Sequence, residues 1–331
     1  MESSQAQQLS NLRCRVELEI YMRLLTSTSI FIISPSLHCH KSPKRLLTTY
    51  KTAISASNPA NSAAGKVVLI TGTGSGIGQA AAASFAIAGA KALILIGRRT
   101  EPLTKTAAIV SQKGPDVQVR LHGDDISDAN ALKSVMDETG STFGQIDIVI
   151  HAAGVLPALG PISTMPVEEL WKALEVNIKG ALNVAQSLLA TGTSEKRAGS
   201  KPVLVTLNTA GMLMPPIPGM GGYVVSKAVL PKLVEYLAAE NPDKLRTVTV
   251  HPGLIRTPMA VELEEAGLKF PYDDVSLPAD FLVWVTSPEA SFLNGKFVFA
   301  NWDVEELKAR KAEIENGTDL RLVLSGLSGD R

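Results

Sequence analysis

A glycine-rich turn between an apolar run and an alanine-rich segment constrains the fold of this chain more than any other stretch. Residues 66–70 are apolar and β-branched, which predicts a buried strand. They are followed by the turn Thr71-Gly72-Thr73-Gly74-Ser75-Gly76-Ile77-Gly78, and residues 79–88 continue as a predicted helix. Glycines are needed where a backbone turns tightly and approaches phosphates without Cβ atoms. A strand, a glycine turn and a helix in this order present backbone N–H groups and a helix N-terminus to a pyrophosphate, so we predict a nucleotide site.

Along the rest of the chain, segments with the pattern of strands alternate with segments that have the pattern of helices. The predicted strands are residues 92–96, 117–121, 146–150, 203–207, 247–250 and 296–299. The predicted helices are residues 104–112, 130–139, 167–189, 223–239, 279–285 and 304–315. This alternation predicts a single α/β domain of the Rossmann type, with a doubly wound parallel sheet of about seven strands. Right-handed crossovers place the carboxyl ends of the strands at one edge, where ligands bind.

A tyrosine and a lysine stand four residues apart at the start of the predicted helix 223–239. Tyr223 and Lys227 therefore lie one above the other on one helix face and can serve the same site. A tyrosine titrates near ~10 in water, and a cation held close to it lowers that pKa. The pair is thus a candidate general acid–base, although the same spacing also arises by chance in many helices.

Together, the motifs Thr71-Gly72-x-x-x-Gly76-x-Gly78 and Tyr223-x-x-x-Lys227 resemble those of the short-chain dehydrogenase/reductase family in its compact single-domain form. The resemblance extends over residues 48–312. It implies an enzyme that moves hydride between a nicotinamide dinucleotide and a carbonyl or alcohol carbon.

The resemblance also implies the catalytic residues. Tyr223 and Lys227 match the family's acid–base pair, and Asn177 matches the asparagine that holds a water linking the lysine to solvent. The family polarises the substrate carbonyl with a serine hydroxyl. We assign this role to Thr209, as a serine-to-threonine change, with Asn208 as the alternative.

Further residues are implied as contacts of the cofactor. They are Gly72, Ser75, Gly76, Ile77, Gly78, Asp125, Ile126, Gly154, Tyr223, Lys227, Ile255 and Thr257. Asp125 can also cap the next helix, and the two roles do not exclude each other. The stretch His151-Ala152-Ala153-Gly154 stands where the family usually has Asn-Asn-Ala-Gly. We interpret His151 as a hydrogen-bonded or exposed histidine beside the cofactor in preference to a base.

The end of the second predicted strand indicates which cofactor is bound. An acidic residue there favours NAD, whereas an arginine accommodates the 2′-phosphate of NADP. This chain has Gly97 where the acid would fall, followed by Arg98 and Arg99. Guanidinium groups pair well with phosphate, so we predict NADP(H) with Arg98 as the contact and Arg99 as the second choice.

The predicted function is an NADP(H)-dependent ketone or aldehyde reductase or alcohol dehydrogenase, and NADP(H) favours reduction. Residues 212–218 and 259–270 are largely apolar and are the predicted walls of a site for a hydrophobic substrate. Several short stretches resemble a fungal branch of the family, which suggests a tailoring step in secondary metabolism. The alternatives are a non-catalytic nucleotide-binding sensor or assembly protein on the same fold, and an enzyme whose reaction ends in dehydration or isomerisation.

Composition excludes several other classes of protein. The formal net charge is zero and no long basic run occurs, so a nucleic-acid partner is not expected. The two cysteines, Cys14 and Cys39, both precede the predicted domain, which fits a reducing, cytoplasmic protein without a cysteine–metal framework. The family resemblance implies a homodimer or homotetramer paired through the predicted helices 167–189 and 223–239.

The ends of the chain do not have the pattern of the domain. We divide the chain into an extension at residues 1–47, an oxidoreductase domain at residues 48–315 and a flexible tail at residues 316–331. The apolar patch at residues 24–33 is too short for a transmembrane helix. The extension is interpreted as disordered or as the product of a wrongly assigned start, in preference to a transit peptide, which would avoid Glu17 and Glu19.

Overall fold

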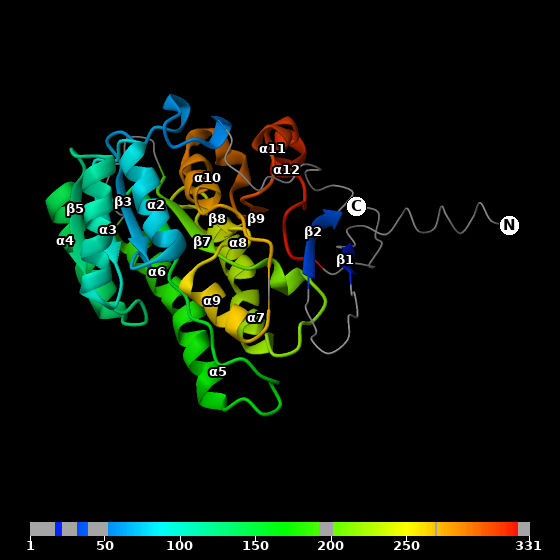
Figure 1. Cartoon of the computed structure of the whole chain (residues 1–331). Coiled ribbons are helices and arrows are strands. Elements are labelled where there is room, and N and C mark those ends of the chain that lie inside the picture. The colour runs from blue at the N-terminus through cyan, green and yellow to red at the C-terminus, as the bar shows by residue number, and fades with distance from the viewer. Residues whose placement is uncertain (1–16, 22–31, 39–51, 192–200, 269, 324–331) are drawn as a thin grey trace.

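The computed structural model describes residues 17–21, 32–38, 52–191, 201–268 and 270–323. Its centre is a sheet of seven parallel strands in the order β5-β4-β3-β6-β7-β8-β9 (Figure 1). The strands are β3 (Val67–Thr71), β4 (Ala92–Ile96), β5 (Gln118–His122), β6 (Ile148–His151), β7 (Val203–Leu207), β8 (Arg246–His251) and β9 (Lys296–Phe299). The predicted fold class, a doubly wound parallel sheet of about seven strands, is confirmed.

Except for the partly exposed edge strand β5, the strands of this sheet are buried on both faces. Along β3, the side chains of Val68 and Ile70 pack into one hydrophobic cluster and those of Val67 and Leu69 into another. Successive side chains of a strand point to opposite faces, so a strand covered on both sides must be apolar at every position. This is why β3 and β4 appear in the sequence as unbroken apolar runs and not as alternating ones.

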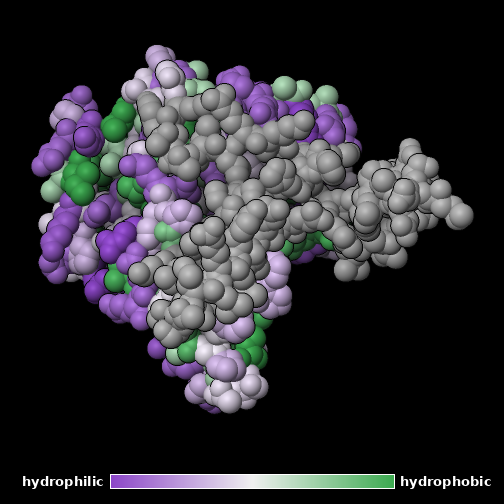
Figure 2. Space-filling model, turned by 45° about the vertical axis from the view of Figure 1, so that its right-hand side comes forward, coloured by the Kyte–Doolittle hydropathy of each residue, from purple (hydrophilic) through white to green (hydrophobic). Residues whose placement is uncertain are grey.

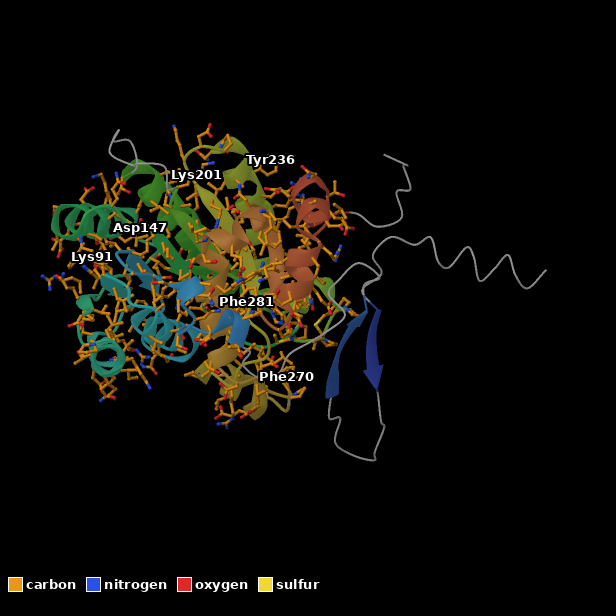
Figure 3. All side chains as sticks on the ribbon, turned by 90° about the horizontal axis from the view of Figure 1, so that it is seen from above. Lys91, Asp147, Lys201, Tyr236, Phe270 and Phe281 are labelled. Carbon is orange, nitrogen blue, oxygen red and sulfur yellow. The ribbon has the colours of Figure 1, made fainter. Side chains whose placement is uncertain are left out.

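Helices cover both faces of the sheet. One face is covered by α2 (Gly76–Ile87), α3 (Thr100–Lys113) and α10 (Ser276–Thr286), whose buried residues join the first cluster. The other is covered by α4 (Ala129–Phe143), α6 (Gly180–Thr191) and α8 (Leu230–Glu240), whose residues join the second. Figure 3 places Phe281 of α10 within the body of the molecule and Tyr236 of α8 at its periphery.

Several predicted helices are interrupted. The predicted helix 167–189 consists of α5 (Val167–Leu174), a π-helical turn (Glu175–Lys179) and α6. The predicted helix 223–239 consists of α7 (Gly221–Ala228) and α8, because Pro231 has no N–H to continue the helical hydrogen bonds. The C-terminal predicted helix is likewise divided into α11 (Val304–Ala309) and α12 (Lys311–Asn316). Helix α9 (Pro258–Glu265) was not predicted.

The order of the strands creates a crevice in the sheet. Strands β3 and β6 are neighbours, yet the chain leaves β3 toward β4 on one side and leaves β6 toward β7 on the other. In open α/β sheets this reversal opens a gap beyond the carboxyl ends of the strands, and ligands bind there. The glycine turn follows β3, so it lies at this point.

Beyond the predicted domain, the structure differs from the expectation at both ends. Within the predicted extension, β1 (Glu17–Tyr21) and β2 (Ile32–His38) pair with each other in an antiparallel ribbon that the sequence analysis did not anticipate. Within the predicted flexible tail, Lys296 Nζ donates to the carbonyls of Gly317 (3.0 Å) and Asp319 (3.1 Å). The start of that tail is therefore fastened to the edge strand β9. No helix of the described segments is long and apolar enough to cross a membrane.

Candidate active site

The glycine turn between β3 and α2 is shaped by close contacts that leave no room for side chains. Gly72 and Gly76 have positive φ angles of 75° and 58°. A Cβ atom on Gly72 would come within 2.6 Å of the backbone N of Ala153, and one on Gly78 would overlap the carbonyl oxygen of Gly72. The turn therefore presents backbone alone to the crevice, at the N-terminus of α2, as a phosphate site requires.

A cleft of about 440 Å³ runs from this turn across the carboxyl ends of the strands. It is lined by nearly all the residues that the sequence analysis assigned to cofactor binding, namely Gly72, Ser75, Gly76, Ile77, Gly78, Arg98, Asp125, Ile126, Gly154, Tyr223, Lys227 and Thr257. Ile255 is the exception, because it is buried beside the cleft and pairs with Asp273. The predicted residues, distant in sequence, thus share one cavity.

The arginines after β4 and the acidic residues after β5 lie at the same end of this cleft. Arg98, Arg99, Asp124 and Asp125 all line it. Burial acts to raise the pKa of Asp125, but hydrogen bonds from Ser127 and the nearby charge of Arg98 lower it overall. Asp125 does not cap the following helix, since that role falls to Asp128, which accepts from two N–H groups of α4.

The predicted catalytic pair lies on α7. Lys227 is 5 % exposed and its Nζ donates to the carbonyl of Leu207 at 3.2 Å. Tyr223 and Lys227 both line the cleft, as their spacing predicted. Burial lowers the pKa of Lys227 to about 8 and raises the pKa of Tyr223 to about 12. The expected lowering of the Tyr223 pKa by the lysine is therefore not found, because loss of solvation dominates for a phenol in this position.

Asn177 lies behind the pair at the centre of the π-helical turn. Its carboxamide accepts from the N–H of Val155 (2.9 Å) and donates to the carbonyl of Val155 (3.0 Å) and to the hydroxyl of Ser226 (2.8 Å). A Cβ atom added to Gly154 would lie 3.1 Å from both Asn177 Oδ1 and Lys227 Nζ. Asn177 therefore joins the strand-end loop to α7 and stands close to the ammonium group. Neither Val155 nor Ser226 was predicted to take part.

In the loop after β7, Asn208 lines the cleft and Thr209 does not. Asn208 is 4 % exposed and lines the cleft. The hydroxyl of Thr209 accepts from the N–H of Gly211 at 3.0 Å as the N-cap of a short 3-10 turn, and Thr209 is not among the lining residues. His251 of β8 is hydrogen-bonded to this loop, since its Nδ1 accepts from the N–H of Ala210 at 3.2 Å.

His151 is buried at the end of β6. Its Nδ1 lies 3.0 Å from the hydroxyl of Thr71, and its Nε2 has no hydrogen-bond partner within the described segments. Burial, with a smaller contribution from the charge of Lys227, lowers its pKa to about 3. His151 is thus neutral near pH 7 and lies outside the cleft lining, which agrees with its interpretation as something other than a base.

The segment that follows β8 contains α9, and hydrogen bonds join its two ends. The carboxylate of Asp273 accepts from the N–H of Leu254 at 3.0 Å, and the N–H of Asp273 donates to the carbonyl of Leu254 at 2.7 Å. Gly253, at φ +89°, leaves no room for a Cβ atom against this carboxylate. Both ends of the segment that carries α9 are therefore joined at one point. Asp273 has no local sequence signal, because its partner is nineteen residues away.

The walls of the cleft are only partly as predicted. Met259 and Glu262 of α9 line it, but residues 212–218 do not, and Met212 and Leu213 instead pack against the core. Val155, Leu156 and Val176 supply apolar lining that the sequence analysis did not identify. The prediction of an apolar wall from residues 212–218 is not what the cleft shows.

A parallel sheet, a glycine turn at its switch point and an adjoining pair of a partly buried tyrosine and a buried lysine define a dinucleotide-binding oxidoreductase. Comparison with known proteins agrees, because the family model described as short chain dehydrogenase matches residues 66–267. The chain belongs to the short-chain dehydrogenase/reductase family, whose fold uses NAD or NADP as cofactor.

Relatives of similar length extend the match over most of the chain. The short chain dehydrogenase/reductase AacuD of Aspergillus aculeatus is 30% identical over 77% of this chain and 86% of its own. The short chain dehydrogenase pigC of Monascus ruber is 33% identical over 78% and 86%, respectively. Among solved structures, levodione reductase superimposes with a TM-score of 0.66 and 26% identity, covering 75% of this chain and 98% of that one.

Proposed function

We propose that this protein is an NADP(H)-dependent reductase of ketones or aldehydes, or in reverse an alcohol dehydrogenase, that acts on a hydrophobic small molecule. The observation that carries the proposal is the shared cleft. It joins the glycine turn, Arg98, Tyr223 and Lys227 in one cavity, although these residues come from three separate parts of the chain. The fungal relatives support the narrower proposal of a tailoring step in secondary metabolism.

The residues of the cleft fit a dinucleotide phosphate. The Cβ-free turn of Gly72, Gly76 and Gly78 leaves space for a pyrophosphate beside the N-terminus of α2. Gly97 follows β4 directly, so no carboxylate stands at that point to select a free ribose 2′-hydroxyl. Arg98 and Arg99 would hold the 2′-phosphate. The nicotinamide, when bound, supplies or accepts the hydride.

Residues of the chain supply the proton that the substrate oxygen receives during reduction. Tyr223, with its pKa raised to about 12, is protonated near pH 7 and donates to the substrate oxygen during reduction. Lys227 keeps a positive charge near that oxygen and, with Asn177 beside it, restores the proton from the solvent side. The hydrogen bond that orients the oxygen is assigned by the sequence analysis to Thr209.

The exterior supports association of two copies. Val167 and Trp171 on α5 are 71% and 63% exposed, and Tyr236 on α8 is 62% exposed. Figure 2 shows hydrophobic residues at the surface toward the end of the molecule that carries α5. Several exposed apolar side chains on the surface of one molecule are typical of protein–protein interfaces. We propose a homo-oligomer built on this face.

Nucleotide titration tests the cofactor assignment. We expect NADPH to bind more tightly than NADH by ~10-fold or more, since a charge-assisted hydrogen bond contributes ~1.5–3 kcal/mol. Arg98→Asp should abolish that preference, measured by the fluorescence of the bound nucleotide. Lys105→Asp is the matched control, because Lys105 carries the same charge on α3 but pairs with Glu101 away from the cleft. Equal binding of NADH and NADPH by the unaltered protein would refute the NADP assignment.

A further inference from the structure

The loop after β7 contains two candidates for the group that orients the substrate oxygen, and the structure separates them. Asn208 continues the strand ladder, because its N–H donates to the carbonyl of Val250 at 2.8 Å. This bond fixes the residue at the carboxyl end of the sheet, where it lines the cleft together with Tyr223 and Lys227. Thr209, one residue later, is not among the lining residues.

In the carboxamide of Asn208, the oxygen accepts a hydrogen bond from the protein, whereas the nitrogen lacks an oxygen acceptor. Its Oδ1 accepts from the N–H of Thr209 at 2.8 Å. Its Nδ2 contacts Met212 Sδ at 3.8 Å, and a thioether is a weak acceptor. An amide nitrogen has two protons to donate. A side chain that is 4 % exposed thus keeps a hydrogen-bond donor without a strong partner beside the cleft.

The hydroxyl of Thr209 takes part in a hydrogen bond within its own loop. It accepts from the N–H of Gly211 at 3.0 Å and caps the short turn Ala210–Leu213. A Cβ atom placed on Gly211 would lie 3.2 Å from this hydroxyl, which shows how closely Thr209 Oγ1 is turned toward its own loop. The Thr209 side chain therefore stabilises the loop that carries Asn208.

We infer that Asn208, and not Thr209, donates the hydrogen bond that orients and polarises the substrate carbonyl; this assignment rests on the proposed reduction. An N–H aimed at the oxygen stabilises the negative charge that develops there as hydride arrives at carbon. An amide N–H does not give up its proton at any working pH. The proton that completes the alcohol therefore comes from Tyr223, and the oxygen-orienting group takes no part in the relay.

Three substitutions test the assignment, with NADPH oxidation by acetophenone and menadione as the readout. Asn208→Asp is isosteric and keeps an oxygen acceptor for the N–H of Thr209, but it removes the donor. We expect it and Asn208→Ala to lower kcat/KM by ~10²–10³, the usual effect of removing one oxyanion donor. Asn208→Ser restores a donor and should recover at least ~10-fold over Asn208→Ala.

The comparison at Thr209 separates the two candidates. Thr209→Val removes the hydroxyl while keeping the volume, and we expect a loss below ~10-fold, from weakening of the loop cap. Thr209→Ser keeps the cap and reports any effect of the methyl group. A loss with Thr209→Val as large as that with Asn208→Ala, or full activity of Asn208→Asp, would overturn the assignment.

A readout without turnover separates failure of this inference from failure of the proposed function. In the complex with NADP⁺, infrared difference spectroscopy on isotopically labelled acetophenone reports the hydrogen bond as a lowered carbonyl stretching frequency. The shift should decrease in Asn208→Asp, where Tyr223 remains as a donor, and should keep its full size in Thr209→Val. If the unaltered protein binds NADPH but neither reduces nor binds either probe, the proposed function is wrong and the assignment falls with it. If it reduces them equally well without the Asn208 donor, the assignment alone is wrong.

Discussion

The two ionisable residues at the centre of the cleft have pKa values displaced in opposite directions by the same cause. Burial disfavours the charged form of each group, so it raises the pKa of Tyr223 to about 12 and lowers that of Lys227 to about 8. At neutral pH the phenol is therefore protonated and ready to donate, while the lysine still carries its charge. These are the protonation states that the proposed reduction of a carbonyl requires.

Reduction should accordingly lose rate as Lys227 loses its proton. At saturating NADPH we expect kcat to be steady from about pH 6 to pH 7 and to fall above about pH 8, the pKa of Lys227. Tyr223→Phe should lower kcat by ~10²–10⁴, because it removes the proton donor but not the ring. Initial rates across this pH range provide the measurement. A flat profile up to pH 10 would exclude a catalytic role for the Lys227 charge.

At the scale of an element, the segment that carries α9 behaves as one closed unit. Asp273 joins its two ends through Leu254, and Arg256 pairs with Glu264 within it at 3.0 and 3.1 Å. Thr257 caps α9 and lies against Gly76 of the glycine turn. Met259 and Glu262 thus reach the cleft from a helix whose base is fastened. Figure 3 shows Phe270, from the segment between α9 and Asp273, at the edge of the molecule.

Removing the Asp273 carboxylate should loosen this unit. Asp273→Ala leaves the N–H of Leu254 without its acceptor, and we expect a loss of ~1–3 kcal/mol in the free energy of unfolding. Faster proteolytic cleavage within residues 256–272 should accompany it. Asp273→Asn keeps an oxygen acceptor and should lose less than half as much. Chemical denaturation and limited proteolysis provide the measurements. Equal stability and equal cleavage rates of Asp273→Ala and Asp273→Asn would rule out a stabilising role for the bond from Leu254 to the Asp273 carboxylate.

At the scale of the whole molecule, the exposed apolar side chains of α5 and α8 predict a dimer. Helix α7 packs against α5 and leads into α8, so it connects the two helices that carry these side chains. Trp171→Glu places a charge on the exposed apolar side of α5 and should convert the dimer to monomer in multi-angle light scattering. Ile87→Glu is the control, since Ile87 is 42% exposed but belongs to α2, on the other face of the sheet from α8. A monomeric unaltered protein would contradict the prediction.

The stability of the molecule should depend on pH through two buried histidines. Burial lowers the pKa of His151 to about 3 and that of His251 to about 4, whereas unfolded histidine titrates near ~6.5. Between about pH 4 and pH 6.5 the unfolded chain therefore binds more protons, so stability falls as the pH falls. Two groups give a limiting slope of ~2.7 kcal/mol per pH unit.

Denaturation between pH 5.5 and 6.5 measures this slope. Asp273 and Asp280 act in the opposite direction, because burial raises their pKa values. His151→Asn places a neutral amide at the end of β6 and should reduce the change in stability across this pH unit by ~1 kcal/mol, because an unfolded histidine is only partly protonated there. An unchanged slope in this variant would mean that His151 is solvated in the folded protein.

Much of the fold could be predicted because its signals are local. Strands β4, β7 and β9 have the predicted bounds, since a strand buried on both faces is an unbroken apolar run. Helix bounds were less predictable, because Pro231 and the π-helical turn at Asn177 divide what periodicity suggests is continuous. Helix α9 has little periodic signal, since only Ala260 of its residues is buried.

The sequence by itself determined the sheet, the position of the glycine turn and the pairing of Tyr223 with Lys227, because each depends on spacing within a single element. Only the tertiary structure decided which groups face the cleft. Asn208 and Thr209 are neighbours in sequence but are placed differently, because the N–H of Asn208 donates to the carbonyl of Val250, whereas the hydroxyl of Thr209 caps its own loop. Asp273 bonds to Leu254 and Gly317 bonds to Lys296, and each pair is so far apart in sequence that no local pattern predicts it. The sign of the Tyr223 pKa shift likewise followed from burial, a property of the folded chain.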